Sequence, residues 1–319
     1  GNMWIIPSTA EKPDDKRITK CDKPKEPTLK PFVKWVGGKG QLVEEIEKLI
    51  SSTDGEELTK YCEPMVGGGA LFFDVIGKHK FKEYYVSDVN AELMNAYKVV
   101  KDDAANLIQK LNEMQMVFLP MDENGRKYFY YSVREKFNST ILSFENATEK
   151  AAQFIFLNKT CFNGLYRVNA KGKFNVPMGA YKNPKICDEE NILNVSNALK
   201  NVTIVCGDYT LSRSFVDKNT FVYVDPPYRP ISQTSGFTSY NTDSFDDNEQ
   251  RRLSKFINEI NLTGAKIVLS NSDPKNVNEE DNFFDDLYKE YTINRIAASR
   301  AINSNGDKRG KINELLISN

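Results

Sequence analysis

The chain has 319 residues, a formal net charge of −1 and 40% hydrophobic residues, enough to bury one large core or a core with a smaller inserted domain. Five scattered cysteines with no paired metal-ligand spacing argue against disulfides and a metal site, and a single histidine disfavours a Ser-His-Asp hydrolase. Since no run is long enough for a membrane helix and no signal peptide is visible, we expect a soluble cytoplasmic protein.

Composition and periodicity divide the chain into four segments. Residues 1–28 are rich in Lys, Asp, Pro and Thr and lack apolar periodicity, which predicts a flexible arm. Residues 29–95 and 201–319 predict a Rossmann-like α/β domain, interrupted at 96–200 by a mainly helical insert with an apolar run from Ala147 to Phe162. In the last segment we expect a helix near Asn248 to Ile260 and strands near Val202, Phe221, Lys266, Tyr291 and Ile312.

A turn that contains tryptophan, glycine and lysine comes first along the chain, as Trp35-Val36-Gly37-Gly38-Lys39. It is not a phosphate-binding loop, because the upstream glycine is missing and neither Ser nor Thr follows the lysine. Lys39 could meet the carboxylate of a ligand, with Trp35 packing beside it. A surface turn anchored by Trp35 is the alternative.

A glycine-rich turn follows the first predicted strand, from Glu63 through Gly67-Gly68-Gly69 to an apolar helix that reaches Phe73. Glycines let the backbone approach a ligand closely, and the start of a helix offers free N–H groups. Asp88 ends a second strand about twenty residues later, where dinucleotide-binding folds hold ribose hydroxyls with an acid. The spacing indicates an adenosine-containing cofactor, although the turn lacks the GxGxxG pattern. Glycine-rich packing with a capping aspartate is the alternative.

The most informative motif is Asp225-Pro226-Pro227-Tyr228, which follows the apolar run from Phe221 to Val224. Asp225 and the carbonyl of Pro226 could hold the two hydrogens of an exocyclic amine and leave its lone pair facing a methyl donor. Pro227 stiffens the turn, and Tyr228 offers a flat surface on which an extruded base could stack. Taken alone, the tetrapeptide could equally be an ordinary turn at a strand end.

Basic and aromatic residues alternate between residues 151 and 187, and no acid interrupts them. Such a stretch suits contact with phosphates and bases, although an exposed loop can be basic by chance. The basic members are Lys159, Arg167, Lys171, Lys173, Lys182 and Lys185, and the aromatic ones Phe162, Tyr166, Phe174 and Tyr181.

These blocks, in this order, resemble the DNA adenine N6-methyltransferases of the Dam type (the D12 class), including the GATC-specific enzymes of restriction-modification systems. The match also takes in Ser270-Asn271-Ser272 and the arginine-rich segment from Arg300 to Leu316, and spans about residues 29 to 319. It implies a class I S-adenosylmethionine-dependent methyltransferase fold with a mixed seven-stranded sheet. The cofactor implied is S-adenosyl-L-methionine, contacted at Trp35, Gly37, Gly38, Lys39, Glu63, Gly67, Gly69, Asp88, Asp208 and Asp225.

The resemblance also assigns residues 96–200 as the DNA target-recognition domain and predicts a recognition hairpin within it. Arg167 can grip a guanine edge and Asn163 can pair with base edges. Phe162 or Leu165 could wedge into the stack that a flipped adenine vacates. Asn163-Gly164 would also serve as a simple tight turn. The DNA contacts expected from the resemblance are Phe162, Asn163, Leu165, Arg167, Pro177, Tyr181 and Arg309.

Two positions depart from the family pattern, since Met65 replaces a frequent aromatic residue and Ala180 replaces a common basic one.

The polar loop at residues 229–240 suits either a lid over the site or a surface loop.

Taken together, the sequence predicts methyl transfer to N6 of adenine in double-stranded DNA containing GATC, by base flipping and direct in-line transfer, with Asp225, Pro226, Pro227 and Tyr228 as the catalytic residues. We expect no metal, no membrane and, where a cognate restriction endonuclease exists, a separate polypeptide. The alternatives are a related RNA or protein-glutamine methyltransferase, disfavoured by Asp225 in place of Asn, and a DNA-binding protein whose methyltransferase site has decayed.

Overall fold

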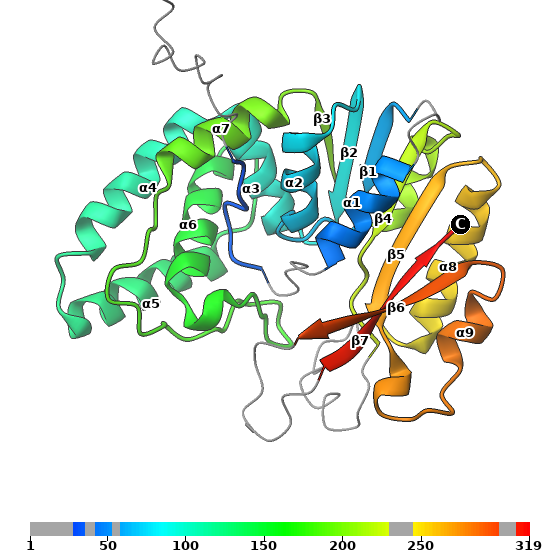
Figure 1. Cartoon of the computed structure of the whole chain (residues 1–319). Helices are drawn as coiled ribbons and strands as arrows, with labels where there is room; N and C mark the ends of the chain where they lie inside the picture. Colours follow the sequence, from blue (N-terminus) through cyan, green and yellow to red (C-terminus); the bar gives the residue numbers. More distant parts are fainter. Residues whose placement is uncertain (1–27, 36–41, 53–57, 230–244, 300–310) are drawn as a thin grey trace, which may run out of the picture.

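A seven-stranded sheet forms the centre of the computed structural model, which describes residues 28–35, 42–52, 58–229, 245–299 and 311–319 (Figure 1). The strand order is β3-β2-β1-β4-β5-β7-β6; neighbours from β3 to β5 are parallel, whereas β7 runs antiparallel between β5 and β6. This arrangement confirms the predicted Rossmann-like methyltransferase fold and each predicted strand. The strands are β1 (Lys60–Glu63), β2 (Glu83–Asp88), β3 (Val202–Cys206), β4 (Thr220–Val224), β5 (Lys266–Ser272), β6 (Thr292–Ser299) and β7 (Lys311–Ser318).

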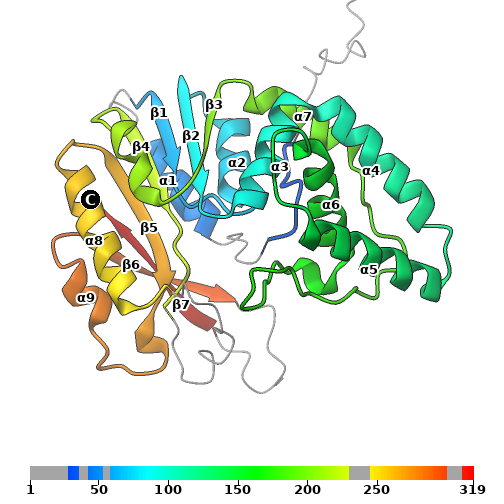
Figure 2. The same cartoon turned by 180° about the vertical axis from the view of Figure 1, so that it is seen from behind.

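Alternating side chains along the strands divide the core into two hydrophobic clusters, one on each face of the sheet. Phe221 and Tyr223 of β4 belong to the first cluster, while Val222 and Val224 belong to the second. This alternation follows from the two-residue period of a strand. Helices cover both faces (Figures 1 and 2). The first face carries α1 (Leu42–Ser52) and α2 (Ala70–Lys78), and the second carries α8 (Asp247–Asn261) and α9 (Phe283–Leu287).

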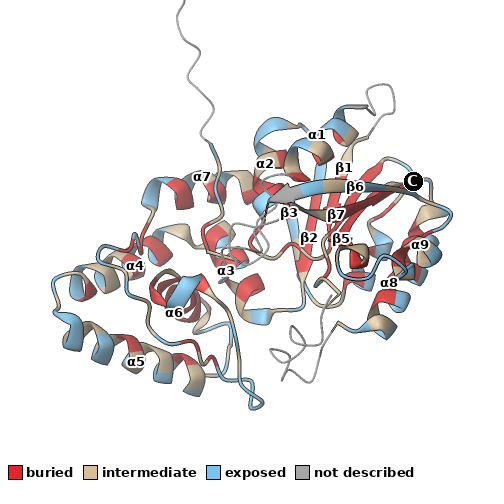
Figure 3. Ribbon diagram, turned by 60° about the horizontal axis from the view of Figure 1, so that its bottom comes forward, coloured by how far each residue is buried: buried red, intermediate tan, exposed pale blue. Residues whose placement is uncertain are grey.

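The long connection between β2 and β3 is mainly helical, as predicted, and lies beside the sheet in Figure 1. Its central helix, α6, is buried on nearly every side (Figure 3). The same hydrophobic cluster runs from these helices to the sheet, and the expected boundary at residue 96 falls inside α3. The division into catalytic and recognition domains stays a prediction. The helices are α3 (Ala91–Asp102), α4 (Ala104–Phe118), α5 (Glu123–Ser139), α6 (Ala147–Thr160) and α7 (Glu189–Leu199).

Side-chain caps fix where several helices begin. Asn90 accepts a hydrogen bond from Leu93 N at 3.0 Å and caps α3, immediately after β2 ends. Asp246 accepts from the backbone N–H groups of residues 248 and 249 and caps α8. Such caps satisfy N–H groups that have no partner within the helix. Short 3₁₀ turns are η1 (Phe162–Gly164), η2 (Tyr209–Ser214) and η4 (Pro274–Asn276).

A buried lysine joins the helices of the insert. Lys150 of α6 is only 2% exposed, and its Nζ donates to the carbonyls of Phe137 at 2.8 Å and Thr140 at 2.9 Å. The same ammonium lies 3.2 Å from Glu92 of α3 and 3.9 Å from the centre of the Phe137 ring. A buried charge of this kind is tolerated because every donor has a partner.

We predict that Lys150→Met lowers the free energy of unfolding by about 2–4 kcal/mol, because two carbonyls and a carboxylate lose their partner. Lys136→Met is the control, because Lys136 is exposed and pairs with Glu149 at the surface; we expect a loss below about 1 kcal/mol. Urea denaturation at neutral pH measures both. Equal effects of the two substitutions would contradict a structural role for the buried ammonium.

Candidate active site

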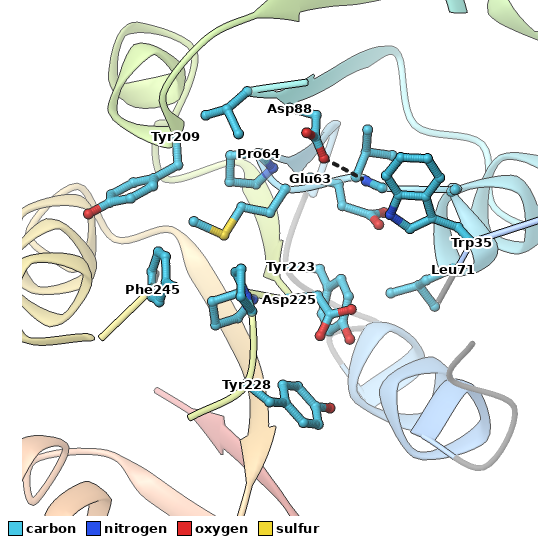
Figure 4. Close-up of a pocket in the computed structure, with 18 of the residues that line it drawn as sticks. Trp35, Glu63, Pro64, Leu71, Asp88, Tyr209, Tyr223, Asp225, Tyr228 and Phe245 are labelled. Carbon is cyan, nitrogen blue, oxygen red and sulfur yellow. Dashed lines mark hydrogen bonds between the residues drawn. The ribbon is translucent and has the colours of Figure 1, made fainter. Parts of the chain in front are cut away.

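A pocket of about 1160 Å³ opens where the carboxyl ends of β1, β2 and β4 meet. Figure 4 shows Tyr209 and Phe245 on one side of it, Trp35 and Leu71 on the other, and Asp225 between them. Ligands of open parallel sheets bind at this edge. The lining residues are 31, 33, 35, 63–71, 88–89, 208–209, 223, 225–228, 245–246, 248–249 and 314.

The glycine turn predicted after β1 forms one wall of the pocket. Gly67 and Gly69 have φ values of 51° and 73°, in the left-handed region that favours glycine. A Cβ on Gly68 would lie 2.6 Å from the Cβ of Trp35, and one on Gly69 would lie 2.4 Å from the hydroxyl of Tyr97. The turn therefore requires glycine both for its backbone and for its close packing, and it leads directly into α2.

Asp88 ends β2 and holds the glycine turn in place. Its Oδ2 accepts a hydrogen bond from Gly67 N at 3.1 Å, which is the dashed line in Figure 4. Its Oδ1 accepts from Asn90 N at 2.9 Å. Burial raises the pKa of this carboxyl, although the backbone bonds favour its ionised form. A carboxylate oxygen accepts more than one hydrogen bond, so Asp88 retains acceptor capacity toward the pocket.

Asp208 also lines the pocket, but its carboxylate is engaged elsewhere. It caps η2 by accepting from Thr210 N at 3.0 Å, and it pairs with Arg252 at 2.7 Å. These contacts give Asp208 a structural role that the sequence did not reveal. Its predicted contact with the cofactor stays a prediction.

The loop after β4 brings the predicted catalytic residues into the pocket. Ser270 Oγ of β5 donates to Asp225 Oδ1 at 2.8 Å, and the Tyr223 hydroxyl lies 2.9 Å from the same Oγ. Because the Ser270 proton points at Asp225, Tyr223 is the donor in the second bond. Gln250 of α8 donates to Pro227 O at 3.1 Å. Both sides of the tetrapeptide are thus held by buried polar side chains.

Tyr228 lines the lower part of the pocket in Figure 4. Its hydroxyl donates to Glu314 Oε2 of β7 at 3.3 Å. Burial, with the nearby carboxylates of Asp225 and Glu314, raises the pKa of the Tyr228 phenol far above its ordinary value. The ring is therefore a neutral flat surface at physiological pH.

Glu63, the last residue of β1, is a buried acid in the pocket wall. It is 3% exposed, and Tyr61 donates to its Oε2 at 2.7 Å. Burial, together with the nearby Asp225 carboxylate, raises the pKa of Glu63 to about 8, although the hydrogen bond from Tyr61 acts in the opposite direction. Glu63 is therefore largely neutral below that pH and is ready to ionise beside a cationic ligand.

Trp35 joins the pocket to the predicted recognition hairpin. Its ring stacks on Tyr166 with a centroid separation of 5.7 Å and an interplanar angle of 21°. The described residues do not include Gly37, Gly38, Lys39 or Arg309, nor nearly all of the predicted arm and lid.

The predicted recognition hairpin is a turn with two antiparallel bridges, Cys161 to Met178 and Val168 to Phe174. Asn163 has a φ of 53° and Gly164 a φ of 63°, which confirms a tight turn at this dipeptide. Phe162 is 52% exposed, and its backbone N–H donates to Pro177 O. The DNA contacts assigned to this segment stay predictions.

Other predicted hairpin residues differ in their surroundings. The Arg167 Nε donates to Asn175 Oδ1 at 2.8 Å on the exposed side of the hairpin. Leu165 packs against the core. Tyr181 lies under the ammonium of Lys34, 3.8 Å from its ring centre. The basic side chains Arg167, Lys171, Lys173, Lys182 and Lys185 are exposed, as contact with phosphates requires.

Gln250 and Glu314 are among the residues at the site that were not predicted. Gln250 is fully buried although it lies on the apolar face of α8 with Leu253 and Ile257. A polar residue at that helical spacing was the available signal. Glu314 gave no signal, because its role depends on β7 inserting beside β5.

Within the described part of the chain, no three His, Cys, Asp or Glu side chains gather where they could ligate a metal ion. None of the helices described there combines the length and the apolar character needed to cross a bilayer.

Residues 35–302 match the family model of the D12 class N6 adenine-specific DNA methyltransferases. The chain is 50% identical over 293 residues to the type II methyltransferase M.MjaIII of Methanocaldococcus jannaschii, covering 91% of this chain and 99% of that protein. It is 37% identical to the type II methyltransferase M1.LlaDCHI of Lactococcus lactis subsp. cremoris, with 91% and 95% covered. It is 33% identical to a DNA adenine methylase of Haemophilus influenzae, with 92% and 97% covered.

The raised pKa of Glu63 makes stability depend on pH. Because the folded-state pKa of about 8 exceeds the ordinary value of 4.5, the unfolded chain ionises first as the pH rises. The contribution of the neutral Glu63 carboxyl to the free energy of unfolding is fully present at pH values below 4.5. It decreases as the pH rises from there through about 8.

We therefore predict that Glu63→Gln, which keeps an acceptor for Tyr61, gains stability relative to the wild type by about 1 kcal/mol per pH unit between about pH 5 and 8. The gain should level off above that range. Urea unfolding of both proteins at four or five pH values measures it. A difference that stays constant with pH would show that Glu63 titrates normally.

Proposed function

Because the chain belongs to the D12 class N6 adenine-specific DNA methyltransferase family, we propose that its pocket holds S-adenosyl-L-methionine beside an adenine turned out of double-stranded DNA. The observation that carries this proposal is the presence of Asp88 and Asp225 in one pocket of about 1160 Å³. That volume exceeds the upper end of ordinary small-molecule sites, about 1,000 Å³, and so suits two ligands side by side.

The half of the pocket around the glycine turn fits the methyl donor. Asp88 has acceptor capacity for ribose hydroxyls, and Gly67 and Gly69 let the backbone approach closely. Glu63 suits a cationic ligand, since ionisation of a buried acid is favoured by a positive charge. Trp35 closes this side. We infer further contacts from Gly37, Gly38, Lys39 and Asp208.

Asp225 would orient the amine of the target adenine. When bound, the donor supplies an electrophilic methyl group on a sulfonium sulfur. Asp225 and the carbonyl of Pro226 would accept the two N6 hydrogens and so leave the lone pair free for direct in-line transfer of the methyl group. Asp225 also stabilises the positive charge that develops on N6, and the proton then leaves to solvent. Pro227 stiffens this loop, while the neutral ring of Tyr228 stacks on the base.

The hairpin after α6 would read the DNA, and we propose GATC as the target. Asn175 fixes the Arg167 guanidinium through Nε, and the two terminal amino groups can then meet O6 and N7 of guanine. The exposed ring of Phe162 suits a wedge into the duplex. The remaining proposed contacts are Asn163, Leu165, Pro177, Tyr181 and Arg309.

A cognate restriction endonuclease, where one exists, would be a separate chain, and the enzyme would act on DNA in the cytoplasm.

We predict that labelled methyl transfers from S-adenosyl-L-methionine to a duplex with one GATC site and not to a scrambled duplex. Asp225→Ala should lower kcat by about 100- to 1000-fold or more, because the amine loses its charged acceptor. Asp217→Asn is the control, since Asp217 pairs with Lys60 at the other end of β4. Equal labelling of both duplexes would contradict GATC specificity, and an active Asp225 variant would contradict the assigned role.

A second prediction concerns the hydroxyl that holds Asp225. Ser270→Ala should lower kcat about 10-fold with little change in the KM for DNA, because a bond to a carboxylate is lost without removing any substrate contact. Ser254→Ala is the matched control, a buried serine of α8 that donates to Leu287 O. An unchanged kcat in the Ser270 variant, with stability lowered as in the control, would make Ser270 purely structural.

A further inference from the structure

A buried asparagine joins the part of the pocket proposed to bind the methyl donor to the proposed recognition hairpin. Asn158 lies in α6 and is 2% exposed. Its Oδ1 accepts from Lys34 N at 2.7 Å, and its Nδ2 donates to Lys34 O at 2.7 Å and to Gly164 O at 3.0 Å. The amide thus uses both donors and its oxygen on the backbones of two separate segments.

Only an asparagine suits this position. Aspartate lacks the two donors, and an apolar residue of similar size satisfies none of the three backbone groups. A buried polar group without a partner is costly, so both segments depend on this amide for their position.

The two segments that Asn158 joins lead to different ligands. Lys34 precedes Trp35, which lines the pocket and packs against the glycine turn. Gly164 lies in the hairpin turn, two residues before Tyr166, whose ring stacks on Trp35. A Cβ on Gly164 would lie 2.4 Å from the Cβ of Lys34, so the backbones are also closely packed.

From these contacts we propose that Asn158 is a positioning residue that makes methyl-donor binding and DNA binding cooperative; this inference rests on the proposed function. A ligand that orders Trp35 also orders the hairpin, since the same amide and the same ring stack hold both. The second ligand then binds a segment that has already lost its conformational entropy, so the two ligands bind with positive coupling.

The fold supplies a matched control. Asn191 of α7 accepts from Lys30 N at 3.1 Å and donates to Lys30 O at 2.9 Å, in the same two-bond arrangement. It is also buried. None of its described bonds reaches the hairpin. Asn191→Leu therefore removes the same chemistry without cutting the proposed link.

The test measures binding, not activity. Titration calorimetry gives the dissociation constant of a short GATC duplex with and without saturating S-adenosylhomocysteine, for the full chain and its variants. We expect S-adenosylhomocysteine to tighten duplex binding about 5- to 100-fold in the wild type and in Asn191→Leu. In Asn158→Leu the factor should fall below about 2. The duplex should tighten S-adenosylhomocysteine binding by the same factor in each protein, because coupling is reciprocal.

A second variant, Tyr166→Leu, removes the ring that stacks on Trp35 and should also reduce the coupling factor. This variant tests the proposal if Asn158→Leu does not fold. Three outcomes would overturn this proposal alone. They are a wild-type coupling factor in both Asn158→Leu and Tyr166→Leu, an equal loss of coupling in Asn191→Leu, and independent binding of the two ligands to the wild type. A wild type that binds the duplex but no S-adenosylhomocysteine would overturn the proposed donor site and this inference with it.

Discussion

Parallel pairing of β1, β2 and β4 is the constraint on which the rest of the structure depends. Tyr61 pairs with Tyr84 on one side and with Phe221 on the other, so the three strands end at one edge of the sheet. Residues far apart in the chain, such as Asp88 and Asp225, therefore meet in one pocket. The positions of the glycine turn, of the loop that carries Asp225 and of the helices that hold them all depend on this alignment.

The same convergence crowds acids into a partly desolvated space. Glu63, Asp88, Asp225 and Glu314 all line the pocket, and burial raises the pKa of the first two. A bound cation favours the ionised form of a buried acid and offsets the cost of its desolvation. The described acids of the pocket thus favour a positively charged ligand, as the proposed sulfonium donor would be.

Strand-end residues were predictable because local patterns locate them: an acid or a glycine turn after an apolar run lies at the edge of a parallel sheet. The fold class, the strands after residue 200 and the turn at Asn163 were predictable for the same reason. Tyr223, Gln250 and Asn158 were not assigned to the site, because their roles depend on packing between distant segments. A polar residue within a helix or strand does not disclose its partner in the sequence.

The insertion between β2 and β3 has a consequence for the order of folding. Tyr84 pairs with Val202, and the residues that separate them form α3 to α7. Closing so long a loop is entropically costly until its own helices have compacted around α6. We therefore expect β3 to join the edge of the sheet late, after the helical block has formed. The backbone bond from Gly207 N to Asp88 O would form in that same late step, so the carboxyl end of β2 reaches its final setting only when the insert is already in place.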